Sequence, residues 1–137
     1  MRQPLWKVVP GRPKLWWLLK LVFPELRARQ KTHDINLAFG DTIYCSKPLN
    51  DAQLAHEEVH LRQHHYSKVF AFFYAIAFRL SPRFRLRSEL EAYRVELKAA
   101  GPTHINEIAA KLASPLYGNL LSIEEARRVL ANDDQAL

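Results

Sequence analysis

The chain has 137 residues, which suits one compact domain, and 48% of them are hydrophobic while 25% are charged, as in folded globular proteins. Cys45 is the single cysteine, which excludes an internal disulfide framework and favours a reducing compartment. The formal net charge of +6 is uneven: residues 1–31 carry eight basic side chains and one acidic one, whereas residues 32–137 have a net charge of −1. We therefore expect a basic, Trp-rich segment over residues 1–32 and a single domain over residues 33–137.

The N-terminal segment is expected to hold short elements, because three prolines interrupt its start: Pro4, Pro10 and Pro13. One helix can begin at Pro13 and end before Pro24, and a second short helix is expected over residues 26–31. The apolar run over residues 15–23 is interrupted by Lys20, lacks a following small-residue cleavage site and is far shorter than the ~20 residues that span a bilayer. We therefore expect neither a cleaved export signal nor a membrane span here.

A β-hairpin is expected next. Apolar side chains alternate with small or polar ones over residues 35–39, Gly40 and Asp41 follow as a two-residue loop, and residues 42–45 form the second strand. Glycine at the first loop position suits a type II′ turn, which joins antiparallel strands.

Helices are expected over most of the remaining chain. Asn50 can cap the first of them, with Gln53 reaching back in a capping box. Residues 51–80 contain no glycine or proline and exceed one ordinary helix, so we expect a bend near residues 64–68. The apolar run over residues 69–78 indicates a buried core helix, because it is too short to span a membrane. Three further helices should begin at capping residues and end near residues 100, 113 and 131, their caps being Ser81 (followed by Pro82), Thr103 and Ser122. This pattern predicts a mainly helical α+β fold with one small antiparallel hairpin.

Residues 56–60 read His-Glu-Glu-Val-His, an H-E-x-x-H motif within the first predicted helix after the hairpin. Residues four apart project from one helix face, so His56 and His60 can offer two imidazole nitrogens to one zinc ion. Glu57 emerges beside them and can act as a general base toward a water that the metal activates. The motif therefore indicates a metal-dependent hydrolase, with a solvated polar helix face as the plain alternative.

A zinc site of this kind needs a third protein ligand. His64 lies on the same stripe, but eight residues of helix rise ~12 Å, so one ion cannot bridge His56 and His64. We therefore place His64 and His65 behind the ligands or at the surface. Cys45 is another candidate, although a cysteine at the end of a strand is more often a small core residue. The remaining candidates are acidic residues of the following long helix: Glu89, Glu91 and Glu96.

Residues 88–93, Ser-Glu-Leu-Glu-Ala-Tyr, resemble the glutamate helix of gluzincin metallopeptidases, which carries E-x-x-A-D or E-x-x-A-N. The resemblance covers about residues 33–100, includes the hairpin and Gln63, and is greatest to small zincins of bacteria and their phages, the minigluzincins. It implies that Glu89 is the third ligand and that Tyr93 replaces the Asp or Asn that orients a ligand histidine. Glu91 lies ~200° around the helix from Glu89, so only one of the two can face the metal.

The resemblance implies a zincin-like fold that binds one Zn²⁺ and hydrolyses peptide bonds in peptides or proteins, with Glu57 as the general base. A further donor to the oxyanion is expected, and His104 and Tyr117 are candidates by residue type alone. The strand over residues 42–45 is expected to bind substrate by strand addition.

Two basic surface features leave a second function open. Three tryptophans occur among the lysines of the N-terminal segment: Trp6, Trp16 and Trp17. Such a segment can pack its tryptophans on the core, form a lid over the active-site groove, or contact a membrane surface or partner through residues 4–31. A second basic cluster indicates a solvated helix face, since no nucleic-acid recognition motif accompanies it: Arg79, Arg83, Arg85 and Arg87. The alternative function is a non-catalytic zincin-fold module that contacts a membrane surface or a protein partner through its basic N-terminus. We expect a cytoplasmic location, with peripheral membrane association as its variant.

Overall fold

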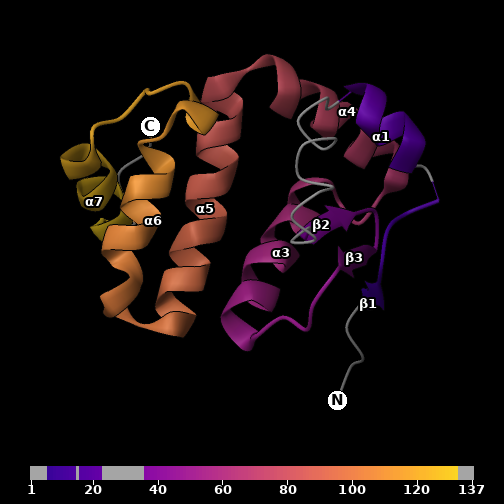
Figure 1. The fold of residues 1–137 in the computed structure, drawn as a ribbon, viewed down its shortest axis with the longest axis horizontal. Helices are drawn as coiled ribbons and strands as arrows, with labels where there is room; N and C mark the ends of the chain where they lie inside the picture. The colour runs from indigo at the N-terminus through magenta and orange to yellow at the C-terminus, as the bar shows by residue number, and fades with distance from the viewer. Residues whose placement is uncertain (1–5, 15, 23–35, 133–137) are drawn as a thin grey trace.

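The computed structural model of the chain describes residues 6–14, 16–22 and 36–132 (Figure 1). The short helix expected over residues 26–31 lies outside these ranges. The described elements form a mainly helical α+β fold, as predicted, in which a small sheet precedes most of the helices. In chain order the strands and helices are β1 (Lys7–Pro10), α1 (Trp16–Val22), β2 (Asn36–Phe39), β3 (Thr42–Cys45), α3 (Asp51–Gln63), α4 (Lys68–Leu80), α5 (Pro82–Ala100), α6 (Ile105–Leu112) and α7 (Ile123–Ala131).

The sheet contains the predicted hairpin and one strand more. β2 and β3 pair antiparallel, and Gly40 takes a φ of 65°, the left-handed value that the first loop position of a type II′ turn requires. The additional strand β1 pairs parallel with β3, with Lys7 opposite Thr42 and Pro10 opposite Cys45. Proline is tolerated in β1 because β1 is an edge strand. No local sequence pattern predicts this four-residue strand, because its partner is distant in the chain.

The strand order β1-β3-β2 overturns the expected mode of substrate binding at residues 42–45. β3 lies in the centre of the sheet, so its backbone hydrogen-bonding groups are already engaged by β1 on one side and β2 on the other. Strand addition needs an unpaired sheet edge, and β3 has none. The prediction for residues 42–45 is therefore wrong, because it assumed a two-stranded hairpin.

The predicted bend between the two helices that follow is confirmed. α3 ends at Gln63, and His65 and Tyr66 take left-handed φ angles of 55° and 53°. Ser67 then caps α4 by accepting a hydrogen bond from the backbone N–H of Phe70. The turn sends the chain from α3 into α4 without a glycine.

The C-terminal helices follow their predicted caps with one exception. Ser81 caps α5, and Ser122 caps α7 in a capping box with Glu125. The cap predicted at Thr103 is wrong, because residues 102–104 form a 3₁₀ turn that begins at Pro102, and α6 begins only at Ile105.

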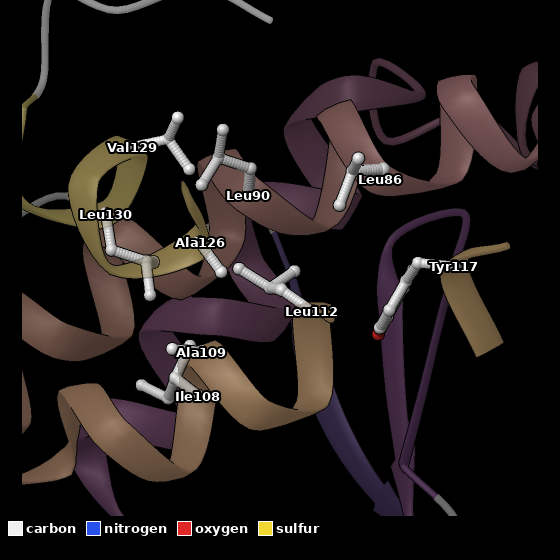
Figure 2. Packing of buried hydrophobic residues seen from close by; sticks show 9 residues of the cluster. All are labelled: Leu86, Leu90, Ile108, Ala109, Leu112, Tyr117, Ala126, Val129 and Leu130. Atoms are coloured by element: carbon white, nitrogen blue, oxygen red, sulfur yellow. The ribbon is translucent and has the colours of Figure 1, made fainter. Parts of the chain in front are cut away.

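Two apolar clusters flank the central helix pair α3 and α5. The larger joins α5, α6, α7 and the short 3₁₀ turn at residues 115–117 (Figure 2), and its buried members are Leu86, Leu90, Ile108, Ala109, Leu112, Tyr117, Ala126, Val129 and Leu130. The smaller joins α1, β2 and α4 through Trp16, Leu19, Phe39 and Ala71. In Figure 1, α3 and α5 lie side by side between these two groups.

α4 differs from the buried core helix expected over residues 69–78. Ala71 is buried, but Val69, Phe70 and Phe73 are exposed. In the described part of the chain, no helix is both long enough and apolar enough to cross a membrane.

The capping box of α3 generates a first prediction. The Asn50 side chain accepts from the backbone N–H of Gln53 at 2.9 Å, and the Gln53 side chain accepts from the backbone N–H of Asn50 at 3.1 Å. Asn50→Ala removes one of these bonds and should lower the free energy of unfolding by about 1 kcal/mol in urea titrations. Asn36→Ala, the same substitution at an exposed strand position, should change it by less than about 0.5 kcal/mol. Equal stability of Asn50→Ala and the wild type would contradict this role for the cap.

Candidate metal centre

The packing of α3 against α5 brings two histidines and one glutamate together. His56 and His60 lie four residues apart on α3, so their side chains leave the same face, and Glu89 approaches them from α5. Nε2 of His56 lies 3.2 Å from Nε2 of His60 and 3.3 Å from Oε2 of Glu89, which is 3.7 Å from Nε2 of His60. His56 and His60 are buried, and the Glu89 side chain is nearly so. The three residues form a group that can hold a metal ion.

The spacing of these three atoms fits a tetrahedral ion. Zinc binds imidazole nitrogen and carboxylate oxygen at about 2.0–2.1 Å, so two ligand atoms of one tetrahedral site lie about 3.3 Å apart. The three separations among His56, His60 and Glu89 lie close to this value. Nitrogen and oxygen donors in this combination suit zinc and other first-row transition metals.

Gln63 determines which nitrogen of His60 faces Glu89. Its amide NH₂ donates to the backbone carbonyl of Ser88 at 3.0 Å and to Glu91 Oε2 at 2.9 Å. The Gln63 amide oxygen is therefore left to accept, and it lies 2.9 Å from His60 Nδ1 and 2.7 Å from the donating Tyr74 hydroxyl. Since an amide oxygen can only accept, His60 donates from Nδ1 to Gln63, and Nε2 is the ring nitrogen that faces Glu89.

Glu96 holds His56 in the corresponding way. His56 Nδ1 lies 2.7 Å from Glu96 Oε2, and Glu96 is about two helical turns beyond Glu89 along α5. A carboxylate on the outer nitrogen of a ligand histidine fixes its tautomer and raises its basicity. From the sequence alone, Glu96 is expected only as a rival ligand. Its seven-residue spacing from Glu89, which returns to the same helix face, is the signal that would have indicated this role.

The charges within the site compensate one another. Burial opposes protonation of His56, but its contacts with Glu89 and Glu96 outweigh burial and raise its pKa from 6.5 to about 10. Burial favours the neutral form of Glu89, yet its close contacts with His56 and His60 outweigh burial and hold the pKa of Glu89 well below 4.5. The buried carboxylate therefore stays charged and needs a cationic partner at its oxygens.

Glu57 is buried beside this group. Burial raises the pKa of its carboxyl above 4.5, and the neighbouring charges of His60 and His56 offset the increase only in part. A carboxyl whose pKa is raised toward neutrality is suited to accept and return a proton.

The other candidate ligands lie elsewhere. Glu91 is exposed and accepts a hydrogen bond from Gln63, on a different side of α5 from Glu89. His64 is buried at the end of α3 with its ring edge against Tyr74, and Cys45 is buried at the end of β3. None of the three belongs to the metal-binding group of the described residues.

Tyr93 reaches the site through its ring. It packs edge-on against His56, with ring centroids 4.6 Å apart, and its hydroxyl is hydrogen-bonded to Tyr117, which is itself buried in the larger apolar cluster. Burial raises the pKa of Tyr93 above 10, so it stays a neutral donor and acceptor. His104 lies in the 3₁₀ turn after α5, is more than half exposed and faces Glu107 at 3.9 Å.

An open cavity of about 740 Å³ adjoins the site from behind His60. Its lining includes Gln63 and Tyr74, which contact the outer nitrogen of His60, and Ser88 and Glu91, which accept hydrogen bonds from Gln63. His56, Glu57, His60 and Glu89 are not among the described residues that line it. The cavity is therefore separated by the Gln63 amide from the atoms that can hold a metal.

Comparison of the chain with protein-family models, with curated proteins and with solved structures gives no match. The candidate site accordingly stands on its own geometry.

Zinc titration of the metal-free protein tests the assignment of the third ligand. We expect one Zn²⁺ per chain, and Glu89→Gln should weaken binding at least tenfold, because it removes the only carboxylate in the metal-binding group. Glu91→Gln is the matched control on the same helix and should bind zinc as the wild type does. The opposite ranking of the two variants would transfer the ligand role to Glu91.

A second variant tests the role of Glu96. Glu96→Gln keeps the size of the side chain but removes the charge beside His56 Nδ1, so zinc affinity should fall by about 10–100-fold while one equivalent is still bound at saturation. Glu107→Gln, an exposed substitution on α6, should leave the affinity unchanged. Loss of the whole equivalent in Glu96→Gln would instead make Glu96 a direct ligand.

Proposed function

We propose that this protein is a zinc-dependent metallopeptidase of gluzincin type, with His56, His60 and Glu89 as metal ligands and Glu57 as the general base. The observation that carries the proposal is the convergence of two Nε2 atoms and one carboxylate oxygen, each histidine being anchored through its opposite nitrogen. Anchored outer nitrogens are typical of metal-ligating histidines.

The number of protein donors favours catalysis over a structural role for the ion. Structural zinc sites are closed by four protein ligands, whereas catalytic sites use three and keep one position for water or substrate. The described residues place three ligand residues in the group, and two histidines with one glutamate are a catalytic set. Bound zinc would supply a Lewis acid that lowers the pKa of water to about 7 and polarises a carbonyl group.

Glu57 supplies the proton transfers. It precedes Val59 and His60 on the buried face of α3, and its charge interacts with both histidines and with Glu89. In peptide hydrolysis a base removes a proton from the attacking water and then returns a proton to the departing amine. The raised pKa of the buried Glu57 carboxyl makes its carboxylate a stronger base than that of an exposed glutamate, which suits removal of the proton from water. The protonated carboxyl can then return this proton to the departing amine.

The Tyr93 ring packs against His56, and its hydroxyl is hydrogen-bonded to Tyr117. Tyr93 stands where related glutamate helices carry an Asp or Asn, and its ring packs on the imidazole. In this chain Glu96 takes over the carboxylate contact with His56 Nδ1. We infer that Tyr93 positions the His56 ring by packing against it, and that Glu96 orients the same ring through its contact with Nδ1.

The test compares two neighbouring glutamates. Glu57→Gln should bind zinc as the wild type does but lose at least 10²-fold in hydrolysis of a peptide library, with new termini counted by mass spectrometry. Glu58→Gln, at the next position of α3, should retain activity.

Two results would overturn the proposal. Equal cleavage by Glu57→Gln and the wild type would remove Glu57 from the mechanism. Absence of cleavage by the zinc-loaded wild type would favour the alternative, a non-catalytic module with a zincin-like site.

A further inference from the structure

One face of α4 is apolar and exposed to solvent. Its large side chains Val69, Phe70, Phe73 and Leu80 are between 56% and 76% exposed. Val69, Phe73 and Leu80 are separated by four and seven residues, so at ~100° per residue they lie within ~40° of one another around the helix. Exposed apolar residues are common singly, but an aligned set on one helix marks a surface that contacts an apolar phase or partner.

The opposite face of α4 packs against the protein. Ala71 belongs to the smaller apolar cluster, Tyr74 reaches Gln63 of α3 with its hydroxyl, and the ring of Tyr74 packs edge-on against Phe84 of α5. α4 is therefore hydrophobic on both its inner and its outer side, although only the inner side is covered by described residues. A helix that is apolar all round is found in a protein core or in contact with lipid.

The neighbouring helix α1 repeats this arrangement. α1 packs against α4 in Figure 1, and Trp16 and Leu19 join Ala71 in the smaller cluster. Trp17 and Leu21, four residues apart, are 61% and 62% exposed. Tryptophan is enriched where an apolar phase meets water, because its large ring is apolar and its N–H is polar.

Both helices lie in stretches of sequence without acidic residues. No Asp or Glu occurs in residues 1–24 or in residues 59–88. Exposed basic residues occur in or directly before the two helices: Lys14, Lys68 and Arg79. An exposed apolar face flanked by basic side chains is complementary to a bilayer that contains anionic lipids.

We propose that the outer faces of α4 and α1 dock the protein on the surface of an anionic membrane. α4 has 13 residues and is about 20 Å long, which is shorter than the roughly 30 Å hydrocarbon core of a bilayer, so it lies in the interface and does not span it. The same charge opposes a second copy of the chain as the occupant, because a symmetric dimer through α4 would bring two basic surfaces together. The inner face of α4 holds Tyr74 against the metal centre, so docking places that centre close to the membrane.

Vesicle co-sedimentation of the full chain tests this inference. The protein should sediment with vesicles of phosphatidylcholine and phosphatidylglycerol (7:3) and much less with phosphatidylcholine alone, and binding should fall severalfold between 0.1 and 0.5 M salt. Phe70→Ser/Phe73→Ser should reduce partitioning to the anionic vesicles by about tenfold or more, because two exposed phenylalanines no longer enter the interface.

The matched control removes two apolar side chains from another surface. Leu120 and Ile123 are also exposed but lie before and at the start of α7, and Leu120→Ser/Ile123→Ser should bind vesicles as the wild type does. Zinc affinity and thermal unfolding of both double variants confirm that each is folded.

Three outcomes would overturn the inference. One is equal vesicle binding by the wild type and the α4 variant. Another is equal loss of binding in the two double variants. The third is a dimer in light scattering that the α4 substitutions dissociate while vesicles bind neither form, which would make the α4 face an interface between two copies.

Discussion

The burial of a charged carboxylate between two helices is the constraint on which this structure depends. Glu89 lies between α3 and α5 with its oxygen within 3.7 Å of two imidazole nitrogens. A buried charge without partners costs several kcal/mol, so the surroundings of Glu89 must supply opposite charge and hydrogen bonds. The protein meets this demand with His56 and His60, which are in turn held by Glu96 and Gln63.

The same demand fixes how α3 and α5 pack. Successive contacts pair His56 with Glu96, His60 with Glu89, and Gln63 with Ser88, so the residue numbers rise along α3 as they fall along α5. The two helices are therefore antiparallel, and the polar contacts define their register. Apolar packing alone tolerates sliding of one helix along another far better than this set of directed contacts does. The apolar clusters lie on either side of this helix pair, and the polar contacts between α3 and α5 define its register.

α4 connects the candidate metal centre to the exterior. Its inner face contributes the Tyr74 hydroxyl to the Gln63 amide, and its outer face carries the exposed phenylalanines. A single helix thus supports the anchoring of His60 and presents the apolar surface. The chain changes direction on both sides of α4, at the left-handed residues 65–66 and at Ser81, and these turns hold the helix against both α3 and α5.

Local sequence signals predicted the elements that depend on neighbouring residues. The hairpin, the break after α3, the caps at Asn50, Ser81 and Ser122 and the pairing of His56 with His60 all follow from backbone preferences or helical spacing within a few positions. Strand β1 was missed because its partner is 35 residues away and its own four residues carry no turn or alternation signal. The cap at Thr103 failed because Pro102 begins a 3₁₀ turn that competes with the helix start.

By itself, the sequence determined that two histidines and a glutamate share one helix in the spacing of a metal site, and that acidic residues follow on the next long helix. Helical spacing left the choice among those acids open, and the register of two packed helices brings Glu89 to the two histidines. Glu89 reaches both Nε2 atoms, Glu96 reaches the outer nitrogen of His56, and Glu91 turns to Gln63. The tertiary structure also decided that the apolar run of α4 has an exposed side. The composition of a helix records how apolar it is, whereas which face is covered depends on the elements that pack against it.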